Sequence, residues 1–281
     1  MQDAAFREFT QAGATVIWGD CCTVLAGRVA DASVDLVFAD PPYNIGKQFA
    51  GFADRWPSVE AYLAWCHVWL DLCVAKLRPG GSLYLMASTQ SMPLLDLYLR
   101  GRLTVLSRIV WHYDSSGVQA KHKFGSMYEP ILHCVKGGAT YTFNGDAVRV
   151  EAPTGARRRL IDYRKPTPAL YAATKVPGNV WHFPRVRYRM PEYQRHPSQK
   201  PAALLDRIVL ASSNPGDLVL DPFAGTFTTA AAAQRLGRRS IGIECERDYV
   251  AIGLRRLGMN QSLDGAASPP NRSAGRKPRR A

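Results

Sequence analysis

Short apolar runs alternate with amphipathic segments along most of the chain. The apolar runs predict buried strands at 15–18, 34–39, 82–87, 103–111, 130–135, 218–220 and 240–243. The amphipathic segments predict a short helix reaching 29 and longer helices over 58–77, 90–99, 200–211 and 228–236. Strands that alternate with helices predict an α/β fold with a doubly wound, mostly parallel sheet. No helix separates the runs at 103–111 and 130–135, so these strands must pair antiparallel, and we expect an antiparallel strand at the sheet edge.

One stretch of the chain lacks this periodicity. From residue 139 to 196 the apolar pattern fails and six prolines accumulate, which indicates an inserted region rather than part of the sheet. Residues 14–138 and 197–258 together form the main domain on either side of it. The tail over 262–281 is rich in Pro, Ser and Arg, a composition typical of disordered segments.

The bulk composition is that of a globular protein. The 281 residues contain enough apolar side chains for a full core. No run of about 18 apolar residues occurs and the first residues do not resemble a signal peptide, so we expect a cytoplasmic protein without a membrane partner. The six cysteines form no Cys-x-x-Cys pair, so we expect reduced thiols and no metal site.

Positive charge is concentrated in the inserted region. The chain carries a formal net charge of +13, which predicts an acidic partner. Between Arg149 and Lys200, twelve Lys and Arg stand against three acidic residues. A solvated face would mix both signs of charge, whereas this stretch interleaves its cations with aromatic residues. The pattern favours contact with phosphates.

Asp40-Pro41-Pro42-Tyr43 follows the predicted strand at 34–39. Proline has no N–H, so we expect the backbone carbonyls here to point into a cavity, and the tyrosine ring offers a stacking surface. This set suits a flat base that carries an amine, although the four residues alone fit an ordinary proline turn equally well. Asp20 also ends a strand, so we expect Asp20 and Asp40 to face one crevice.

A second polar cluster follows the strand at 218–220. Asp221-Pro222-Phe223-Ala224-Gly225-Thr226 opens a helix, and Glu244 ends the next strand, 19 residues after Gly225. Doubly wound folds place a ribose-binding carboxylate at that spacing. The loop lacks the glycines and the lysine of pyrophosphate-binding loops, which favours a nucleoside without phosphates. With Asp221 for an ammonium, Glu244 for a ribose and Asp20 for an adenine amine, the residues predict S-adenosylmethionine.

From about residue 16 to 257 the chain resembles the amino-methyltransferases of DNA, in the β-class arrangement where the catalytic motif precedes the cofactor motif. Asp40-Pro41-Pro42-Tyr43 matches the catalytic tetrapeptide of that family, and the run 221–225 matches its cofactor loop. His196-Pro197-Ser198-Gln199-Lys200-Pro201 matches the segment that closes over the methionine end of the cofactor. The resemblance implies a class I S-adenosylmethionine-dependent methyltransferase fold, circularly permuted, with the insertion as its target-recognition region.

The motifs and the resemblance together define three sets of candidate residues and no metal ligand. The catalytic set is Asp40, Pro41, Pro42 and Tyr43. The cofactor-binding set is Asp20, Cys21, Asp40, Ser198, Gln199, Lys200, Asp221, Phe223, Ala224, Gly225, Thr226, Glu244 and Cys245. The DNA-binding set is Lys121, Lys123, Arg157, Arg158, Arg159, Arg185, Arg187 and Arg189.

The cofactor loop departs from the family pattern at one position. Members of the family usually continue Gly-Ser-Gly-Thr, whereas this chain reads Gly225-Thr226-Phe227-Thr228. Phe227 therefore replaces a small residue. We expect it either to alter the packing of the helix or to cover the cofactor.

The implied reaction is direct methylation of an exocyclic amine. Such an amine is a poor nucleophile because its lone pair is delocalised into the ring. Hydrogen bonds from the amine to the Asp40 carboxylate and the Pro41 carbonyl would localise that lone pair for in-line transfer, without a covalent intermediate. The base lies inside a duplex, so the protein must flip it out.

The motif favours adenine N6 as the target, because cytosine-N4 members of the family more often begin the tetrapeptide with Ser. Cytosine-N4 methylation of DNA, methylation of an RNA amine and a non-catalytic nucleic-acid-binding module are the alternatives, in that order. The resemblance implies double-stranded DNA as the partner, at a bacterial nucleoid, with or without a cognate restriction enzyme. Homodimers are common in the family, but the sequence shows no interface stripe.

Overall fold

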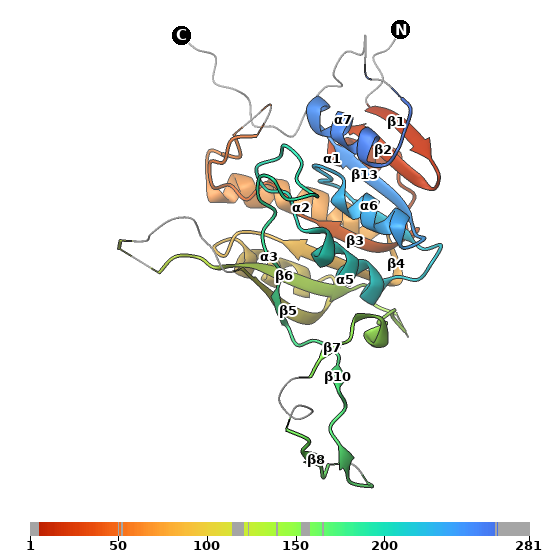
Figure 1. Cartoon of the computed structure of the whole chain (residues 1–281). Helices are drawn as coiled ribbons and strands as arrows, with labels where there is room; N and C mark the ends of the chain where they lie inside the picture. Colours follow the sequence, from red (N-terminus) through yellow and green to blue (C-terminus); the bar gives the residue numbers. More distant parts are fainter. Residues whose placement is uncertain are drawn as a thin grey trace.

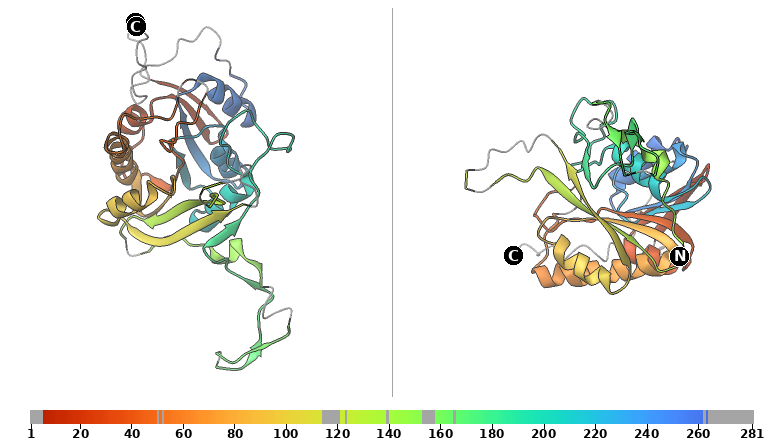
Figure 2. Two further views of the ribbon diagram at one scale, coloured as in Figure 1. Left: turned by 90° about the vertical axis from the view of Figure 1, so that its left-hand side faces the viewer. Right: turned by 90° about the horizontal axis from the view of Figure 1, so that it is seen from below.

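The computed structural model describes residues 6–49, 51, 53–113, 121–122, 124–138, 140–152, 158–164, 166–261 and 263. A nine-stranded sheet runs through the centre of these residues, between two layers of helices (Figure 1, Figure 2). In spatial order its strands are β1 (Phe6–Gln11), β2 (Ala14–Gly19), β13 (Arg239–Glu244), β12 (Leu218–Asp221), β3 (Val34–Ala39), β4 (Leu77–Met86), β6 (Tyr128–Val135), β5 (Thr104–His112) and β11 (Val180–His182).

Most neighbouring strands are parallel, which confirms the doubly wound α/β fold class. The strands from β2 to β4 are all parallel, and so are β5 and β11. β6 is antiparallel to both β4 and β5, as the missing helix between β5 and β6 predicted. β6 is third from the edge rather than at it, because β5 and β11 lie outside it. The antiparallel strand at the opposite edge is β1.

The strand order shows the circular permutation. β12 and β13 come from the end of the chain, yet they lie between β2 and β3 in the middle of the sheet. The strand that ends at Asp221 is therefore the neighbour of the strand that precedes Asp40. The chain leaves these two strands in opposite directions across the sheet, and a ligand crevice forms at such a reversal, outside the carboxyl ends of the strands.

Among the described residues, three helices cover each face of the sheet. α1 (Cys21–Gly27), α2 (Val59–Lys76) and α3 (Met92–Arg100) pack on one face, and α5 (Ala202–Ser212), α6 (Thr228–Arg235) and α7 (Arg247–Arg256) on the other (Figure 2). Successive side chains of a strand point to opposite faces, so Val37 of β3 packs with Trp69 of α2, while Phe38 packs with Ile208 of α5. None of the helices in the described ranges is long and apolar enough to cross a membrane.

The inserted region forms an arm that projects from the edge of the sheet (Figure 1). It begins with a 3₁₀ turn, η1 (Gly145–Val148), and two short antiparallel pairs follow. These are β7 (Val150–Glu151) with β10 (Thr174–Lys175), and β8 (Ile161–Asp162) with β9 (Ala169–Leu170). The expectation that the whole insertion lies outside the sheet is wrong for β11, which pairs with β5. Three residues are too short a run for apolar periodicity to reveal.

The predicted helices and strands are present, with ends shifted by a few residues. The apolar pattern did not predict β1 or α7. Side chains of β1 are half-buried or exposed throughout, so the strand lacks the alternation that marks a sheet with one buried face. The predicted disordered tail lies outside the described residues, apart from residue 263.

Candidate active site

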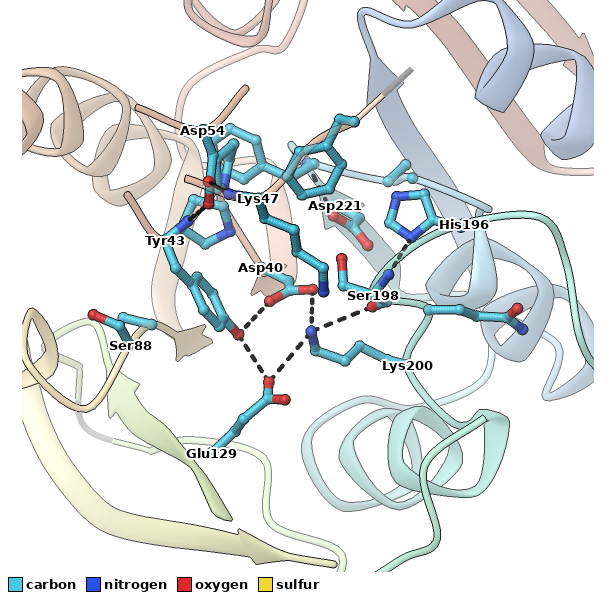
Figure 3. Close-up of a pocket in the computed structure, with 18 of the residues that line it drawn as sticks. Asp40, Tyr43, Lys47, Asp54, Ser88, Glu129, His196, Ser198, Lys200 and Asp221 are labelled. Carbon is cyan, nitrogen blue, oxygen red and sulfur yellow. Dashed lines mark hydrogen bonds and ion pairs between the residues drawn. The ribbon is translucent and has the colours of Figure 1, made fainter. Parts of the chain in front are cut away.

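The two predicted halves of the site line one cavity of about 380 Å³ at the carboxyl ends of β3 and β12 (Figure 3). The tetrapeptide Asp40-Pro41-Pro42-Tyr43 contributes one wall and the loop after β12 another. The segment 196–200 and the loop after β3 close the cavity between them. The lining residues used below are Asp40, Pro41, Pro42, Tyr43, Asp54, Tyr113, Glu129, Arg185, His196, Ser198, Lys200, Asp221, Phe223, Gly225, Glu244 and Cys245.

Asp40 is held by two protein donors. The Tyr43 hydroxyl lies 2.7 Å from Asp40 Oδ1, and the Lys200 ammonium lies 2.7 Å from Asp40 Oδ2 (Figure 3). Both donors also reach Glu129 Oε2, at 3.1 Å from the Tyr43 hydroxyl and 3.4 Å from Lys200 Nζ. The Ser198 carbonyl lies 3.4 Å from the same ammonium. Two carboxylates, one ammonium and one hydroxyl therefore form a closed polar cluster.

Burial governs the charges in this cluster. Burial raises the pKa of Asp40, and the Lys200 ammonium opposes that shift. Burial alone would lower the pKa of Lys200, but the Asp40 and Glu129 carboxylates outweigh it and raise that pKa. Burial and the two carboxylates hold the pKa of Tyr43 well above its usual value, so its hydroxyl stays a donor.

Asp54 fixes the loop that follows the tetrapeptide. Its side chain accepts hydrogen bonds from the backbone N–H groups of Tyr43, Ile45 and Lys47, and it is 1% exposed. The Pro42 carbonyl accepts a hydrogen bond from the Tyr62 hydroxyl at 2.9 Å. The expectation that the carbonyls after the prolines point freely into the cavity is therefore wrong for Pro42.

Asp221 is a buried carboxyl group, Glu244 is a half-buried one, and both accept hydrogen bonds from neutral donors. Asp221 accepts from the Thr229 hydroxyl at 2.6 Å and from the Phe223 N–H at 3.0 Å. Glu244 accepts three backbone N–H groups, including that of Gly225 at 2.9 Å. Within the described ranges neither forms an ion pair. Burial raises the pKa of each to about 7, so a cationic ligand would be stabilised at Asp221.

Gly225 has a positive φ of 51°, and a Cβ there would lie 3.2 Å from His196 Nε2. The glycine therefore permits the segment 196–200 to approach the cofactor loop. His196 packs its ring against Tyr249, with ring centroids 4.4 Å apart, and burial lowers its pKa to about 3. A neutral imidazole closes this side of the cavity.

Phe227 packs away from the cavity. Its ring is fully buried among residues of β2, α6 and α7, and it is absent from the cavity lining. A Cβ at Gly253 would lie 2.3 Å from its ring, and one at Gly242 would lie 2.7 Å away. Of the two outcomes expected for Phe227, altered helix packing is therefore the observed one, with two glycines making room for the ring.

The structure brings nearly all predicted cofactor residues to the cavity wall, and Asp20 is the exception. Its side chain caps α1 by accepting from the N–H and the hydroxyl of Thr23, each at 2.9 Å. Its other oxygen is buried and has no hydrogen-bond partner among the residues that the structure describes. Gln199 lines the wall, but its amide is bonded to the backbone of Glu192 and Gln194. Lys200 points to Asp40 instead of the cofactor loop. The ligand contacts of all these residues stay predictions.

The predicted DNA-binding residues are spread over three segments. Arg185 lines the cavity mouth, where its guanidinium lies 4.8 Å from the centroid of the Tyr113 ring. Arg158 and Arg159 are exposed on the arm, and the remaining described members are exposed at 121, 187 and 189. Lys123 and Arg157 lie outside the described residues. Their contact with DNA stays a prediction.

The sequence analysis missed Glu129 and Asp54. Glu129 lies near the start of β6. Because β6 is antiparallel to β4, its first residues lie beside the carboxyl end of β4, on the side of the sheet where the cavity is. That rule could have placed Glu129 at the site, since the pairing direction of this strand was predicted. Asp54 is a single acid in an irregular loop, and no sequence signal marks it.

Comparison with known proteins agrees with this geometry. The family model described as DNA methylase matches residues 34–255. The DNA adenine methyltransferase YhdJ of Escherichia coli is 58% identical over 243 residues, covering 86% of this chain and 82% of the relative. TTHA0409 of Thermus thermophilus, solved with S-adenosylmethionine bound, is 26% identical with a TM-score of 0.53, covering 86% of this chain and 93% of that one.

The cytosine-N4-specific PvuII DNA methyltransferase has the same fold, with a TM-score of 0.65 at 17% identity, over 91% of this chain and 88% of that one. A DNA methylase therefore fits the fold and the two-part site. The chain belongs to the N6/N4 DNA methylase family.

Proposed function

We propose that this protein transfers a methyl group from S-adenosylmethionine to the N6 amine of an adenine flipped out of double-stranded DNA. The observation that carries the proposal is the single cavity that joins Asp40-Pro41-Pro42-Tyr43 to the loop after β12. Adenine is favoured over cytosine by the leading Asp40, and by 58% identity to a relative described as an adenine methyltransferase.

The residues present fit the cofactor. Asp221 offers a buried carboxyl group, without an ion pair in the described ranges, for the ammonium of the methionine part. Glu244, 19 residues beyond Gly225, faces the same cavity for the ribose hydroxyls. Asp20 caps α1 and does not line this cavity, so the structure offers no support for its contact with the adenine amine. S-adenosylmethionine supplies a methyl group on a sulfonium that any positioned nucleophile can attack.

Asp40 and Pro41 supply the acceptors for the target amine. Accepting both N–H groups draws the amine nitrogen toward tetrahedral geometry and localises its lone pair. Positioning of the two reactants can supply about 7–11 kcal/mol of the barrier reduction, and this is the main contribution. The Tyr43 ring is placed to stack on the flipped base, which returns about 1–3 kcal/mol of the unstacking cost.

The test is base-resolved methylation with an Asp40→Ala variant. The protein and radiolabelled S-adenosylmethionine are incubated in parallel with unmethylated genomic DNA and with RNA, and the modified nucleosides are identified by mass spectrometry. We expect N6-methyladenine from the wild type and none from Asp40→Ala, with DNA affinity nearly unchanged because phosphate contacts lie elsewhere. Asp146→Ala, at a side chain 93% exposed on η1, serves as the control and should remain active.

Each other result has a definite meaning. N4-methylcytosine as the product would overturn the choice of adenine and keep the reaction class. Label in RNA alone would move the substrate to RNA. Undiminished turnover in Asp40→Ala, or no label from the wild type, would overturn the proposal.

A further inference from the structure

Both oxygens of Asp40 are already occupied by donors of the protein itself. The Tyr43 hydroxyl holds Oδ1 and the Lys200 ammonium holds Oδ2, each at 2.7 Å. Each carboxylate oxygen keeps a second lone pair, so an amine that donates to Asp40 must approach beside these donors and in competition with them. The Lys200 ammonium is the stronger competitor, because a cation binds a carboxylate more tightly than a neutral amine does.

Lys200 cannot simply leave the site. Its side chain is 7% exposed, and an unpaired ammonium at such depth is strongly disfavoured because it has lost its hydration. It therefore needs a second carboxylate within reach. Glu129 provides one, with Oε2 3.4 Å from Nζ and a side chain 17% exposed.

Tyr43 has the same alternative acceptor. A hydroxyl has one proton, so Tyr43 donates to either Asp40 or Glu129 at any moment, although both lie within 3.1 Å. The two donors that occupy Asp40 therefore share Glu129 Oε2 as their second acceptor. A small movement of the hydroxyl proton and of the flexible lysine side chain would leave Asp40 free without unpairing either group.

We propose that Glu129 is a positioning residue that takes up Lys200 and the Tyr43 hydroxyl when the target amine docks on Asp40. This inference rests on the proposed function, because it concerns how an amine gains access to Asp40. Glu129 acts through the two donors and does not touch the reacting atoms. The cluster thus has a resting arrangement centred on Asp40 and a working arrangement centred on Glu129.

Glu129→Gln tests this directly, because the amide has the shape of the carboxylate but not its charge. In the variant Lys200 has Asp40 as its only carboxylate partner and stays there. We expect the single-turnover rate of adenine methylation to fall at least about tenfold, given the cost of separating a buried ion pair without a replacement. Affinity for S-adenosylmethionine should be unchanged. Glu60→Gln, at a fully exposed acid in the first turn of α2, is the matched control.

The second comparison uses Lys200→Met. In this variant no ammonium occupies Asp40. Glu129 is then no longer needed as the alternative partner of Lys200. We expect the double variant Glu129→Gln/Lys200→Met to be no slower than Lys200→Met alone, although Glu129→Gln by itself is impaired. Such non-additivity is the signature of one residue acting through another, and damage to packing would not produce it.

Glu129→Asp keeps the charge and should be faster than Glu129→Gln, which also decides the question if the glutamine variant folds poorly. The inference is overturned if the glutamine variant keeps the wild-type rate, if the losses in the double variant add, or if the aspartate variant is no faster. An inactive wild type would instead overturn the proposed function, so the two failures are distinguishable.

Discussion

Burial of Asp221 lowers the free energy of unfolding when the carboxylate is ionised. The same burial makes the side chain a site for a cationic ligand. Its folded pKa of about 7 is raised from an ordinary value of 3.8, chiefly by burial. The folded state therefore binds more protons than the unfolded state between these two values. The contribution of Asp221 to the free energy of unfolding must then fall as the pH rises from about 4 to 7, and level off above that range.

Asp221→Asn should remove most of this pH dependence. We expect the variant to be more stable than the wild type at pH 8, by at most about 4 kcal/mol, and to lose that advantage near pH 4. It should also lose affinity for S-adenosylmethionine, because an amide cannot pair with the ammonium. Urea unfolding at several pH values measures the first effect and calorimetry the second. Parallel stability curves for the two proteins would contradict the prediction.

At this scale the candidate site was largely predictable where a residue type has a fixed place in a motif. Asp40, Asp221 and Glu244 follow strands, so their convergence on one edge could be inferred from strand ends alone. Asp20 also follows a strand, but its side chain was taken by the N-terminus of α1. Pairing partners such as Glu129 depend on tertiary contacts that no short spacing encodes.

The start of α6 is strained, and packing compensates for it. Phe227 precedes the helix with a φ of 59°, a left-handed conformation that costs a residue of this size about 1–3 kcal/mol. Its fully buried ring is accommodated because position 253 of α7 and position 242 of β13 are both glycine. The packing of α6, α7 and β13 against one another therefore depends on the Phe227 ring.

Gly253→Ala should destabilise the protein by about 1–3 kcal/mol, because the new methyl group would meet the Phe227 ring and overpack the core. The better helix propensity of alanine offsets this only in part. Urea unfolding measures the loss. Adding Phe227→Leu should recover part of it, since leucine is smaller than the ring.

The matched control is Gly27→Ala in α1, where a Cβ meets nothing within 4 Å. It should leave the free energy of unfolding unchanged or raise it slightly. A Gly253→Ala variant as stable as the wild type would show that the ring moves freely. Affinity for S-adenosylmethionine should stay the same in both, because Phe227 does not line the cavity.

Helices and strands were predictable where the apolar pattern extends over many residues. They were missed where the pattern is short. The strand at Val34–Ala39 has the predicted bounds, because a buried run that stops at two prolines has unambiguous ends. α7 has only ten residues and charged side chains at both ends, so its buried face was not evident from the sequence. β11 is held by three pairs with β5, which only the tertiary structure defines.

Over the whole molecule, catalytic chemistry and positive charge are separated. The cavity lining contains none of the described residues between 139 and 184, a stretch that carries seven Lys and Arg against three acidic residues. The arm, which extends away from the sheet (Figure 1), includes Arg158 and Arg159, and both residues are exposed. We infer that the arm contacts DNA phosphates beyond the flipped base, so its contribution to binding should be electrostatic and independent of the target amine.

Arg157→Gln/Arg158→Gln/Arg159→Gln should weaken DNA binding and make it less sensitive to salt. Each phosphate contact contributes about 0.9 to the slope of log affinity against log salt concentration, so the slope should become shallower by up to about 3. Titrations at several salt concentrations measure it. The control replaces Arg28, Arg100 and Arg102, which already pair with carboxylates, and should keep the wild-type slope. An unchanged slope in the arm variant would place these arginines away from the DNA and assign binding to the residues around Arg185.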